Sequence, residues 1–377
     1  MKIGIFTGPT GGHLYPALAF AESLRKRRPE AKILFVTGER GRPLVSKVGR
    51  ELGLQFEFIP DCPFPRPRGL EFLGRFFQFL LKLFCAFWRS ERQLACFKPD
   101  FCIGFGSYAS FPGLVMTRIK GIPTFIHEQN RKIGQANAWL AGGADRIALS
   151  FETNDPLPFS ARTTVTGLPL RASLVEKAAE RSEPSLSSSS PDRVRVLLVG
   201  GSQGSQGINQ LWERMLRLLS DEEKSRLAVT HITGEGERER FQKMYPAIGM
   251  RATVFAYREQ MEELYSRADL AVTRAGAGTL FELALFGLPS IVFPYPYAEG
   301  HQELNARYFE RESALVLLSE ERCSPEELKE NVFALVHSPE LRKKLSRNIH
   351  KLSRPRAAEN LVDAVEALLS EKEVCLT

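Results

Sequence analysis

A run of small residues between two apolar segments is the part of this chain best suited to hold a phosphate group. Residues 274–282 read Arg-Ala-Gly-Ala-Gly-Thr-Leu-Phe-Glu and follow the apolar segment 269–273, which we expect to be a buried parallel strand. Where a strand leads into a helix, backbone N–H groups at the helix start attract anions. Glu282 then lies about one turn inside the predicted helix, where its carboxylate can accept hydrogen bonds from ribose hydroxyls. The pattern indicates a nucleotide site, although an ordinary tight turn with a solvent-facing Glu282 has the same pattern.

Two further glycine clusters also follow predicted strands. A strand at 2–7 precedes Gly8-Pro-Thr-Gly-Gly-His13, and a strand at 194–199 precedes Gly200-Gly-Ser-Gln-Gly-Ser205. One glycine loop alone is weak evidence for a ligand site. Two such loops, each at the start of an alternating series of strands and helices, indicate two similar halves, each with its own anion site.

Length and composition favour two ordinary globular domains. The chain has 377 residues, of which 43% are hydrophobic and 25% charged. Its six cysteines lack CxxC or zinc-ligand spacing and its six histidines lack an HxxxH pair, so we expect no metal site and a reducing cytosol. We expect no secretion signal, because the chain begins directly with a strand. The net charge of +7 favours an anionic partner, either a membrane or a phosphorylated substrate, and no nucleic-acid motif is present.

Strands and helices, which must position the glycine loops, alternate along both halves of the chain. We expect strands at 2–7, 32–37, 55–59, 100–104, 123–127, 146–151 and 163–166, and then at 194–199, 227–233, 252–256, 269–273, 290–294 and 314–318. Short apolar runs separated by helices predict α/β domains with doubly wound parallel sheets. The Ser-rich stretch 178–193 predicts a flexible linker between domains 1–177 and 194–377. From about 324 we expect two or three helices, the last starting at Pro355 and able to pack on the first domain. Ligands of such sheets bind beyond the carboxyl ends of the strands, so we expect the site between the domains.

Five segments, in order and over nearly the whole chain, resemble the MurG family of N-acetylglucosamine transferases, in glycosyltransferase family 28. They are Thr7-Gly-Pro-Thr-Gly-Gly-His-Leu-Tyr-Pro-Ala-Leu-Ala19, Gly104-Phe-Gly-Ser-Tyr-Ala-Ser110, His127-Glu-Gln-Asn130, Gly200-Gly-Ser-Gln-Gly204, and the run from Arg274 to Ala306. The resemblance implies the GT-B fold, in which two Rossmann-like domains face each other across a cleft. It implies transfer of GlcNAc from UDP-GlcNAc to lipid I, the undecaprenyl-diphosphate-MurNAc-pentapeptide. The product is lipid II, formed with inversion at the sugar and without a cofactor or a protein-held metal.

The family also implies where the enzyme acts. The reaction belongs to peptidoglycan synthesis, and through it to cell-wall biogenesis, cell shape and cell division. The expected location is the cytoplasmic face of the inner membrane, as a peripheral protein.

Carried over residue by residue, the resemblance assigns a donor site. Glu282 is expected to bind the ribose, Ser202 and its loop the UDP phosphates with help from Arg171, and Gln302 with His301 the GlcNAc. Asn130 is expected to reach that sugar from the other domain, and the uracil to meet backbone near Tyr257 and Arg258. The complete expected donor set is Thr10, Gly11, Gly12, Asn130, Arg171, Ser202, Gln203, Gly204, Tyr257, Arg258, Ala277, Gly278, Thr279, Glu282, His301 and Gln302.

The expected acceptor site lies in the first half, at Gly12, His13, Ser107, Tyr108 and Gln129. The acceptor hydroxyl must lose its proton as it attacks the sugar, and His13 has the chemistry of a general base near neutral pH. A phosphate-binding or loop-bracing role for His13 remains open. Glu128 and Tyr108 are weaker candidates for the base.

The chain departs from the family pattern at several positions: Pro9, Leu168, Ile232, Arg258 and His301. None of them removes a charge or donor that the mechanism requires. The alternatives are a GT-B transferase for another lipid acceptor such as diacylglycerol, a sugar-nucleotide epimerase, and a non-catalytic scaffold.

The segment 66–92 carries an unusually wide apolar face. Glu71, Arg75, Gln78, Lys82 and Arg89 recur at helical spacing and form a narrow polar stripe, and most other positions are Phe, Leu or Trp. A core-facing helix needs an apolar stripe only somewhat wider than 100°. Charged residues interrupt the run, so a transmembrane span is not expected. We expect part of this helix to be buried and the surplus, with its flanking arginines, to meet an anionic membrane surface.

Overall fold

The computed structural model describes residues 1–45, 53–62, 71–152, 162–180, 193–200, 204–297 and 300–376. The chain divides into two compact units, Met1–Ala172 together with Arg356–Thr377, and Ser173–Pro355. The division therefore falls before residue 177, where we expected the first domain to end. Of the stretch 178–193, expected as the linker, residues 181–192 lie outside the described residues, and 178–179 end the helix Ala172–Ala179.

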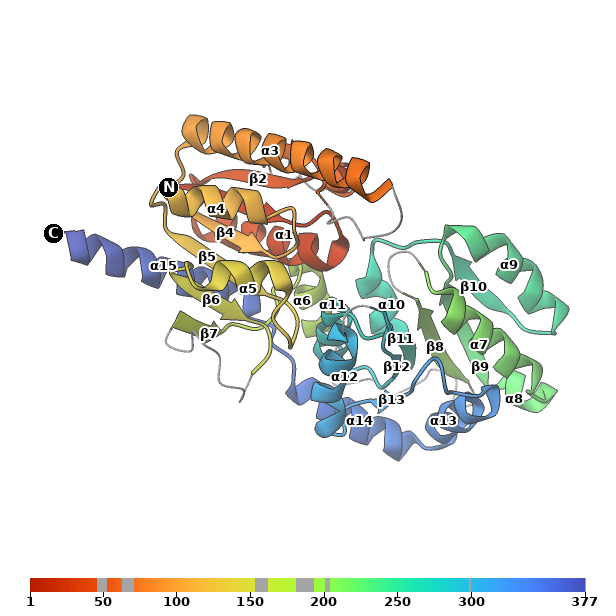
Figure 1. Cartoon of the computed structure of the whole chain (residues 1–377). Helices are drawn as coiled ribbons and strands as arrows, with labels where there is room; N and C mark the ends of the chain where they lie inside the picture. The colour runs from red at the N-terminus through yellow and green to blue at the C-terminus, as the bar shows by residue number, and fades with distance from the viewer. Residues whose placement is uncertain are drawn as a thin grey trace. The chain divides into compact units, whose positions relative to one another are not determined.

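The first unit is a seven-stranded parallel sheet covered by helices (Figure 1). Its strand order is β3-β2-β1-β4-β5-β6-β7. In chain order the elements are β1 (Lys2–Thr7), α1 (Gly11–Arg27), β2 (Lys32–Gly38), η1 (Glu39–Gly41), β3 (Gln55–Ile59), α3 (Glu71–Phe97), β4 (Phe101–Phe105), α4 (Phe111–Ile119), β5 (Thr124–Glu128), α5 (Gln135–Ala141), β6 (Arg146–Leu149), β7 (Thr163–Val165) and, from the end of the chain, α15 (Ala357–Leu376).

The last helix, α15, completes the core of the first unit. Its apolar residues Leu361, Val362 and Val365 are buried in the same cluster as β1, β2 and α1. At the surface Arg27 and Arg28 pair with Glu366 of α15. We expected this helix to start at Pro355. It begins at Ala357, and Pro355 lies in the turn before it.

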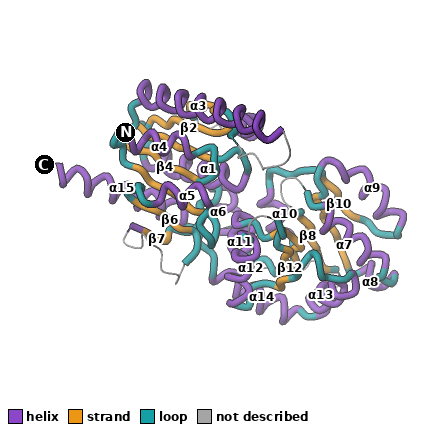
Figure 2. The backbone as a smooth tube through the Cα atoms, viewed as in Figure 1, coloured by secondary structure: helices purple, strands orange, loops and turns teal. Residues whose placement is uncertain are grey.

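The second unit is a six-stranded parallel sheet with the order β10-β9-β8-β11-β12-β13 (Figures 1 and 2). Its elements are α6 (Ala172–Ala179), β8 (Val194–Val199), α7 (Gln206–Arg217), α8 (Asp221–Ser225), β9 (Leu227–Ile232), η3 (Glu235–Glu237), α9 (Arg238–Ala247), β10 (Ala252–Phe255), α10 (Met261–Arg267), β11 (Leu270–Arg274), α11 (Ala277–Leu285), β12 (Ser290–Phe293), α12 (His301–Arg311), β13 (Val316–Leu317), α13 (Pro325–His337) and α14 (Pro339–Lys351).

The topology places a ligand position in each sheet. The strand order reverses direction between β1 and β4 in the first unit and between β8 and β11 in the second. Doubly wound sheets bind ligands beyond the carboxyl ends of the strands at such a reversal. The prediction of two doubly wound parallel sheets is confirmed, and the glycine loops at 8–13, 200–204 and 274–278 follow β1, β8 and β11, the strands at these reversals.

Candidate functional site

In the second unit, the loop after β8 is shaped by glycines at both ends. A side chain on Gly200 would place its Cβ 2.3 Å from the backbone nitrogen of Ser205, and one on Gly204 would lie 2.3 Å from the carbonyl oxygen of Thr233. Gly204 also has a φ of +78°, which favours glycine. Both glycines thus pack closely beside the start of α7, whose first N–H groups have no partner within the helix. The predicted phosphate contacts Ser202 and Gln203 lie outside the described residues.

A buried arginine connects this loop to the next strand. Arg274 ends β11 and donates from Nη2 to Oγ of Ser205, the N-cap residue of α7. Its Nη1 forms an ion pair with Glu320. Only 9% of Arg274 is exposed. Arg274 thus ties the start of α7 to the end of β11.

The start of α11 presents the second set of backbone donors. Gly276 is its N-cap and makes no side-chain cap hydrogen bond. A Cβ on Gly278 would meet no described atom within 4 Å, so the first turn is open on that side. One turn further, Glu282 accepts a hydrogen bond at Oε2 from the hydroxyl of buried Tyr265 at 2.8 Å. Tyr265 therefore orients the carboxylate that the sequence assigns to the ribose.

The remaining expected donor residues of the second unit lie on two other segments. Gln302, at the start of α12, accepts backbone hydrogen bonds at Oε1 from Ala275 at 3.2 Å and Tyr295 at 2.9 Å. Its amide oxygen thus holds the loop before α11, and its amide nitrogen is the end that a sugar hydroxyl can meet. Tyr257 is 47% exposed after β10, and the neighbouring Arg258 donates to Gln260 at 3.3 Å.

In the first unit, α1 begins directly after the opening glycine loop. Its N-cap, Thr10, makes no side-chain cap hydrogen bond, and a Cβ on Gly12 would meet no described atom within 4 Å. His13 lies in this first turn, and its Nδ1 is 2.9 Å from the carbonyl oxygen of Phe105 and 3.2 Å from Oε1 of Gln129. Both partners accept, so Nδ1 carries the proton and Nε2 carries the lone pair of the neutral ring.

His127 contacts Gln129, which in turn contacts His13. It is fully buried, and its Nδ1 accepts from Nε2 of Gln129 at 3.3 Å while its Nε2 donates to the carbonyl of Gly167 at 3.2 Å. Burial lowers the pKa of His127 to about 4, so the ring is neutral near pH 7. These contacts give His127 a bracing role beneath the loop after β5.

Glu128 shapes the loop that follows β5. It is 2% exposed. Its carboxylate accepts from the backbone nitrogen and side-chain amide of Asn130, from the backbone nitrogen of Gly134 and from the side-chain amide of Asn137. These donors occupy both oxygens, which favours a loop-holding role over a proton-transfer role for Glu128. Through Glu128, the loop places Asn130 at a defined position.

The remaining predicted residues of the first unit lie around this centre. Ser107 and Gly106 both have a φ of +71°, and Ser110 closes their turn by donating to both carbonyls. Tyr108 is 37% exposed and donates to Gln135. Arg171 lies over the ring of Tyr15, with 5.0 Å from its guanidinium carbon to the ring centre.

The structure brings some of the predicted residues together. In the first unit Gln129 contacts His13, and Ser107 lies beside it near Gly8. In the second unit Gln302 contacts Ala275 directly after β11, whereas Glu282 contacts Tyr265. Sequence reasoning missed the residues that hold these groups in place: Asn137, Ser205, Tyr265, Arg274 and Glu320. Arg274 opened the motif in the sequence, and its charge shortly before Gly276 and Gly278 was the available signal. Within the described ranges no group of three or more His, Cys, Asp or Glu could hold a metal ion.

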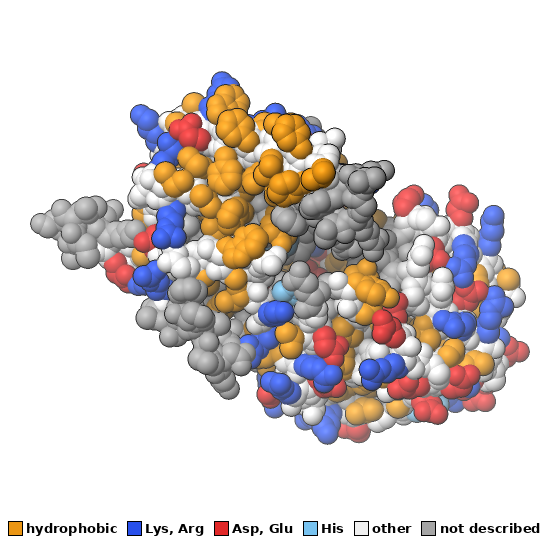
Figure 3. Space-filling model, viewed as in Figure 1, with side chains coloured by type: hydrophobic (Ala, Val, Ile, Leu, Met, Phe, Trp, Pro, Cys, Tyr) orange, Lys and Arg blue, Asp and Glu red, His pale blue; other side chains and the backbone are white. Residues whose placement is uncertain are grey.

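A large apolar surface is exposed on α3. We define the α3 surface by Leu73, Phe77, Leu80, Leu81, Phe84 and Trp88, whose exposed fractions run from 44% to 73%. The opposite side of the helix is buried, at Ala86, Ser90 and Leu94. Figure 3 shows hydrophobic side chains gathered where Figure 1 places α3 and α4. Among the described residues, no helix has the length and apolarity needed to cross a bilayer.

Comparisons with known proteins agree with these features. The Glycosyltransferase family 28 N-terminal domain matches residues 3–149, and the Glycosyltransferase family 28 C-terminal domain matches residues 195–361. The chain is 36% identical, over 99% of both proteins, to the UDP-N-acetylglucosamine–N-acetylmuramyl-(pentapeptide) pyrophosphoryl-undecaprenol N-acetylglucosamine transferase of Carboxydothermus hydrogenoformans.

Solved structures show the same fold. A crystal structure of Acinetobacter baumannii MurG is similar with a TM-score of 0.75 at 24% identity, over 97% of this chain and 99% of that one. A UDP-GlcNAc 2-epimerase from Neisseria meningitidis has a TM-score of 0.66 at 13% identity, over 97% of this chain and 100% of that one, and this shares the fold alone. The matches along the sequence confirm the resemblance that the motifs indicated, and the chain therefore belongs to glycosyltransferase family 28.

Proposed function

We propose that this protein transfers N-acetylglucosamine from UDP-GlcNAc to lipid I, with release of UDP and formation of lipid II. The observation that carries the proposal is the end-to-end identity of 36% with a transferase named for that reaction. The reaction is a step of peptidoglycan synthesis. The geometry of the two units supports donor binding by one unit and acceptor binding by the other.

The second unit is proposed to bind the donor. The leaving group is a nucleoside diphosphate, so negative charge builds on phosphate oxygens in the transition state. The starts of α7 and α11 supply fixed backbone N–H donors at the β8–β11 reversal, and Arg274 holds Ser205 at the start of α7. Preorganised groups of this kind stabilise developing charge without reorganisation. Glu282, oriented by Tyr265, is proposed to accept hydrogen bonds from the ribose hydroxyls.

The first unit is proposed to bind the acceptor and take its proton. His13 donates from Nδ1 to Phe105, so Nε2 is the atom that can accept the proton of the attacking hydroxyl. Gly12 and Ser107 border His13 and are proposed to contact the acceptor together with Gln129 and Tyr108. Glu128 is proposed to position Asn130 and not to act as the base.

We also propose that the α3 surface docks on the cytoplasmic face of an anionic membrane, which would bring the enzyme to its lipid-linked acceptor. The surface combines exposed Phe, Leu and Trp side chains with exposed Arg75, Lys82 and Arg92. Apolar side chains that enter the acyl boundary and cations that meet lipid headgroups are the features of interfacial helices. Arg66 and Arg68, expected to add charge, lie outside the described residues.

One experiment separates the proposed function from its alternatives. The protein is incubated with labelled UDP-GlcNAc, with and without lipid I, and the lipid and nucleotide fractions are separated. We expect labelled disaccharide-lipid and free UDP only when lipid I is present. Conversion of UDP-GlcNAc without lipid I would indicate an epimerase, and transfer to diacylglycerol would indicate another lipid acceptor. If no acceptor is turned over, the protein would be a non-catalytic scaffold.

A further inference from the structure

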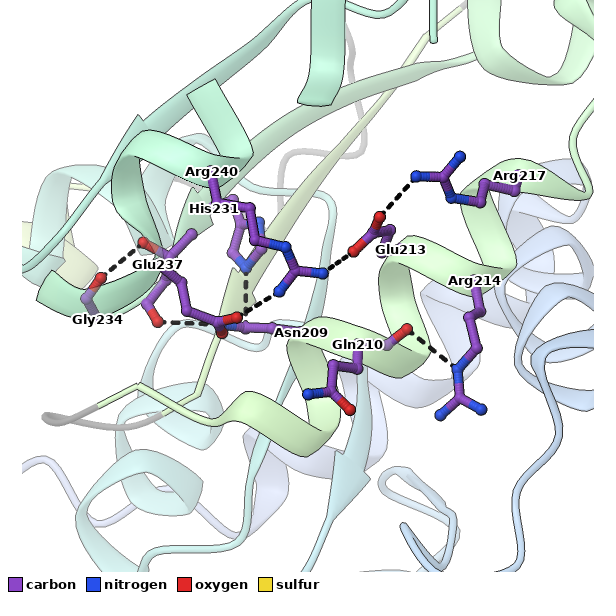
Figure 4. Close-up of polar contacts among 10 residues, drawn as sticks. Asn209, Gln210, Glu213, Arg214, Arg217, His231, Gly234, Glu237 and Arg240 are labelled. Carbon is purple, nitrogen blue, oxygen red and sulfur yellow. Dashed lines mark hydrogen bonds and ion pairs between the residues drawn. The ribbon is translucent and has the colours of Figure 1, made fainter. Parts of the chain in front are cut away.

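A chain of buried hydrogen bonds joins α7, β9 and α9 in the second unit. Nε1 of Trp212 lies 3.0 Å from the hydroxyl of Tyr245, which lies 3.0 Å from Nδ1 of His231. Nε2 of His231 lies 3.0 Å from Oδ1 of Asn209, and Figure 4 shows this last link. All four side chains are at most 1% exposed. Buried polar groups are nearly always hydrogen-bonded, and these four satisfy one another in sequence.

The first donor fixes the direction of every hydrogen bond in this series. The indole N–H of Trp212 can only donate, so the oxygen of Tyr245 accepts and its proton points to Nδ1 of His231. The proton of the neutral imidazole is then on Nε2 and is donated to Oδ1 of Asn209. Burial lowers the pKa of His231 to about 3, so this neutral form holds near pH 7. The amide nitrogen of Asn209 must therefore point away from His231.

That amide nitrogen holds the carbonyl group of Thr233, against which Gly204 lies. Nδ2 of Asn209 donates to the carbonyl oxygen of Thr233 at 3.0 Å and to the carboxylate of Glu237. The same carbonyl of Thr233 lies so close to Gly204 that a Cβ there would be 2.3 Å from it. The orientation of the Asn209 amide thus fixes the surface on which the last residue of the Gly200–Gly204 loop lies.

We propose that Asn209 is a positioning residue for the donor diphosphate, and that Trp212, Tyr245 and His231 keep its amide in the required orientation. Asn209 does not itself touch the nucleotide. It acts through Thr233 on Gly204, the residue before the N-cap of α7, and backbone N–H groups bind phosphate well only when their directions are set in advance. The inference rests on the proposed function, in which the start of α7 binds the diphosphate of UDP-GlcNAc.

The outer end of the network provides a control. Arg240 pairs with Glu237 and Glu213, and Glu213 also pairs with Arg217, as Figure 4 shows. The side chain of Arg217 is 59% exposed, and exposed pairs contribute little. Arg217→Gln therefore removes a charge near the network without affecting the Asn209 amide. Met215→Ala, on the core side of the same helix, destabilises α7 without touching the hydrogen bonds.

The test measures UDP binding by calorimetry and thermal unfolding in the same set of full-length variants. We expect Asn209→Leu to weaken UDP binding about tenfold and Tyr245→Phe about threefold, because Tyr245 acts on the site only through His231 and Asn209. Met215→Ala and Arg217→Gln should leave the Kd within about twofold, even where Met215→Ala lowers Tm as much as Asn209→Leu does. Because Tyr245 acts through Asn209, Tyr245→Phe should have no further effect on Kd in an Asn209→Leu background.

The outcomes distinguish this inference from the function on which it rests. If the wild-type protein does not bind UDP, the proposed donor function fails, and the inference with it. If wild-type protein binds UDP but Asn209→Leu binds it equally well, or if Met215→Ala weakens binding as much, Asn209 is only structural. Should Asn209→Leu not fold, Tyr245→Phe removes a single oxygen atom and decides alone: an unchanged Kd overturns the proposal.

Discussion

Nη2 of Arg274 lies 2.5 Å from Oγ of Ser205 and donates a hydrogen bond to it. Arg274 ends β11, and Ser205 caps α7 after β8, so this contact joins the two loops on either side of the strand-order reversal. The ion pair between Arg274 and Glu320 holds the guanidinium from the other side. A single buried side chain therefore links both halves of the proposed phosphate site.

Arg274→Met should destabilise the second unit by about 3 kcal/mol, because it leaves the largely buried carboxylate of Glu320 without its cation. The double variant Arg274→Met/Glu320→Gln should recover part of that loss, since the remaining group is neutral. Denaturant unfolding of both variants is the measurement. Equal stability of the single and double variants would contradict the assigned ion pair.

Glu282→Ala should weaken UDP binding by about 2–3 kcal/mol, because the ribose hydroxyls lose a charged partner. Tyr265→Phe should weaken it by about 1 kcal/mol, since Glu282 then keeps its charge but loses the hydroxyl that orients it. Calorimetry with UDP measures both. Glu326→Ala, which removes a carboxylate from the first turn of α13, is the matched control and should change nothing. Unchanged affinity in Glu282→Ala would remove Glu282 from the site.

His13→Ala should lower kcat by about 10²–10⁴ if His13 is the base, with little change in UDP affinity. Gln129→Ala should have a smaller effect, because the carbonyl of Phe105 still accepts from Nδ1 of His13. Steady-state kinetics with lipid I measures kcat and KM, and calorimetry measures the affinity for UDP. A loss confined to the KM for lipid I would mean that His13 binds the lipid diphosphate.

Phe77→Ser/Phe84→Ser and Arg75→Glu/Lys82→Glu should each reduce binding to anionic vesicles and leave UDP affinity intact. Phe77 and Phe84 are 62% and 73% exposed, so their replacement removes apolar surface without opening the core. Flotation with vesicles containing anionic phospholipid, at low salt, is the measurement. Leu218→Ser, which changes a 42% exposed apolar residue of the second unit, serves as control. Wild-type protein that stays at the bottom of the gradient would disprove the docking role.

His127 and His231 should make the protein less stable in mild acid. Burial lowers their pKa values to about 4 and about 3, from 6.5 in the unfolded chain. Since the unfolded state binds more protons in this range, their stabilising effect is complete above pH 6.5 and is lost as the pH falls towards the folded values. Between about pH 6.5 and 5, each histidine should lower the free energy of unfolding by roughly 2 kcal/mol.

Denaturant unfolding at a series of pH values measures this loss, and NMR of the ring protons assigns it. The resonances of both rings should stay unshifted down to about pH 5 in the folded protein. Titration of either ring near its ordinary pKa would show that the ring is hydrated and not buried.

The order of strands and helices could be predicted from the sequence because it depends on local patterns. Continuous apolar runs such as 2–7 and 194–199 form central strands, and glycines directly after them allow tight turns into helices. The pattern also located the loops at both strand-order reversals and the wide apolar face of α3. Each of these features is encoded within a short stretch of residues.

Roles that depend on distant partners were decided only by the tertiary structure. In the sequence, Glu128 follows a predicted strand and Glu282 lies one turn inside a predicted helix, and both carboxylates could take part in the reaction. The fold surrounds Glu128 with loop donors and gives Glu282 the hydroxyl of Tyr265. The apolar face of α15 would suit either core, and long-range packing places it in the first unit. Local sequence sets which groups are present, whereas burial and hydrogen-bond partners come from residues far apart in the chain, and these determine what each group can do.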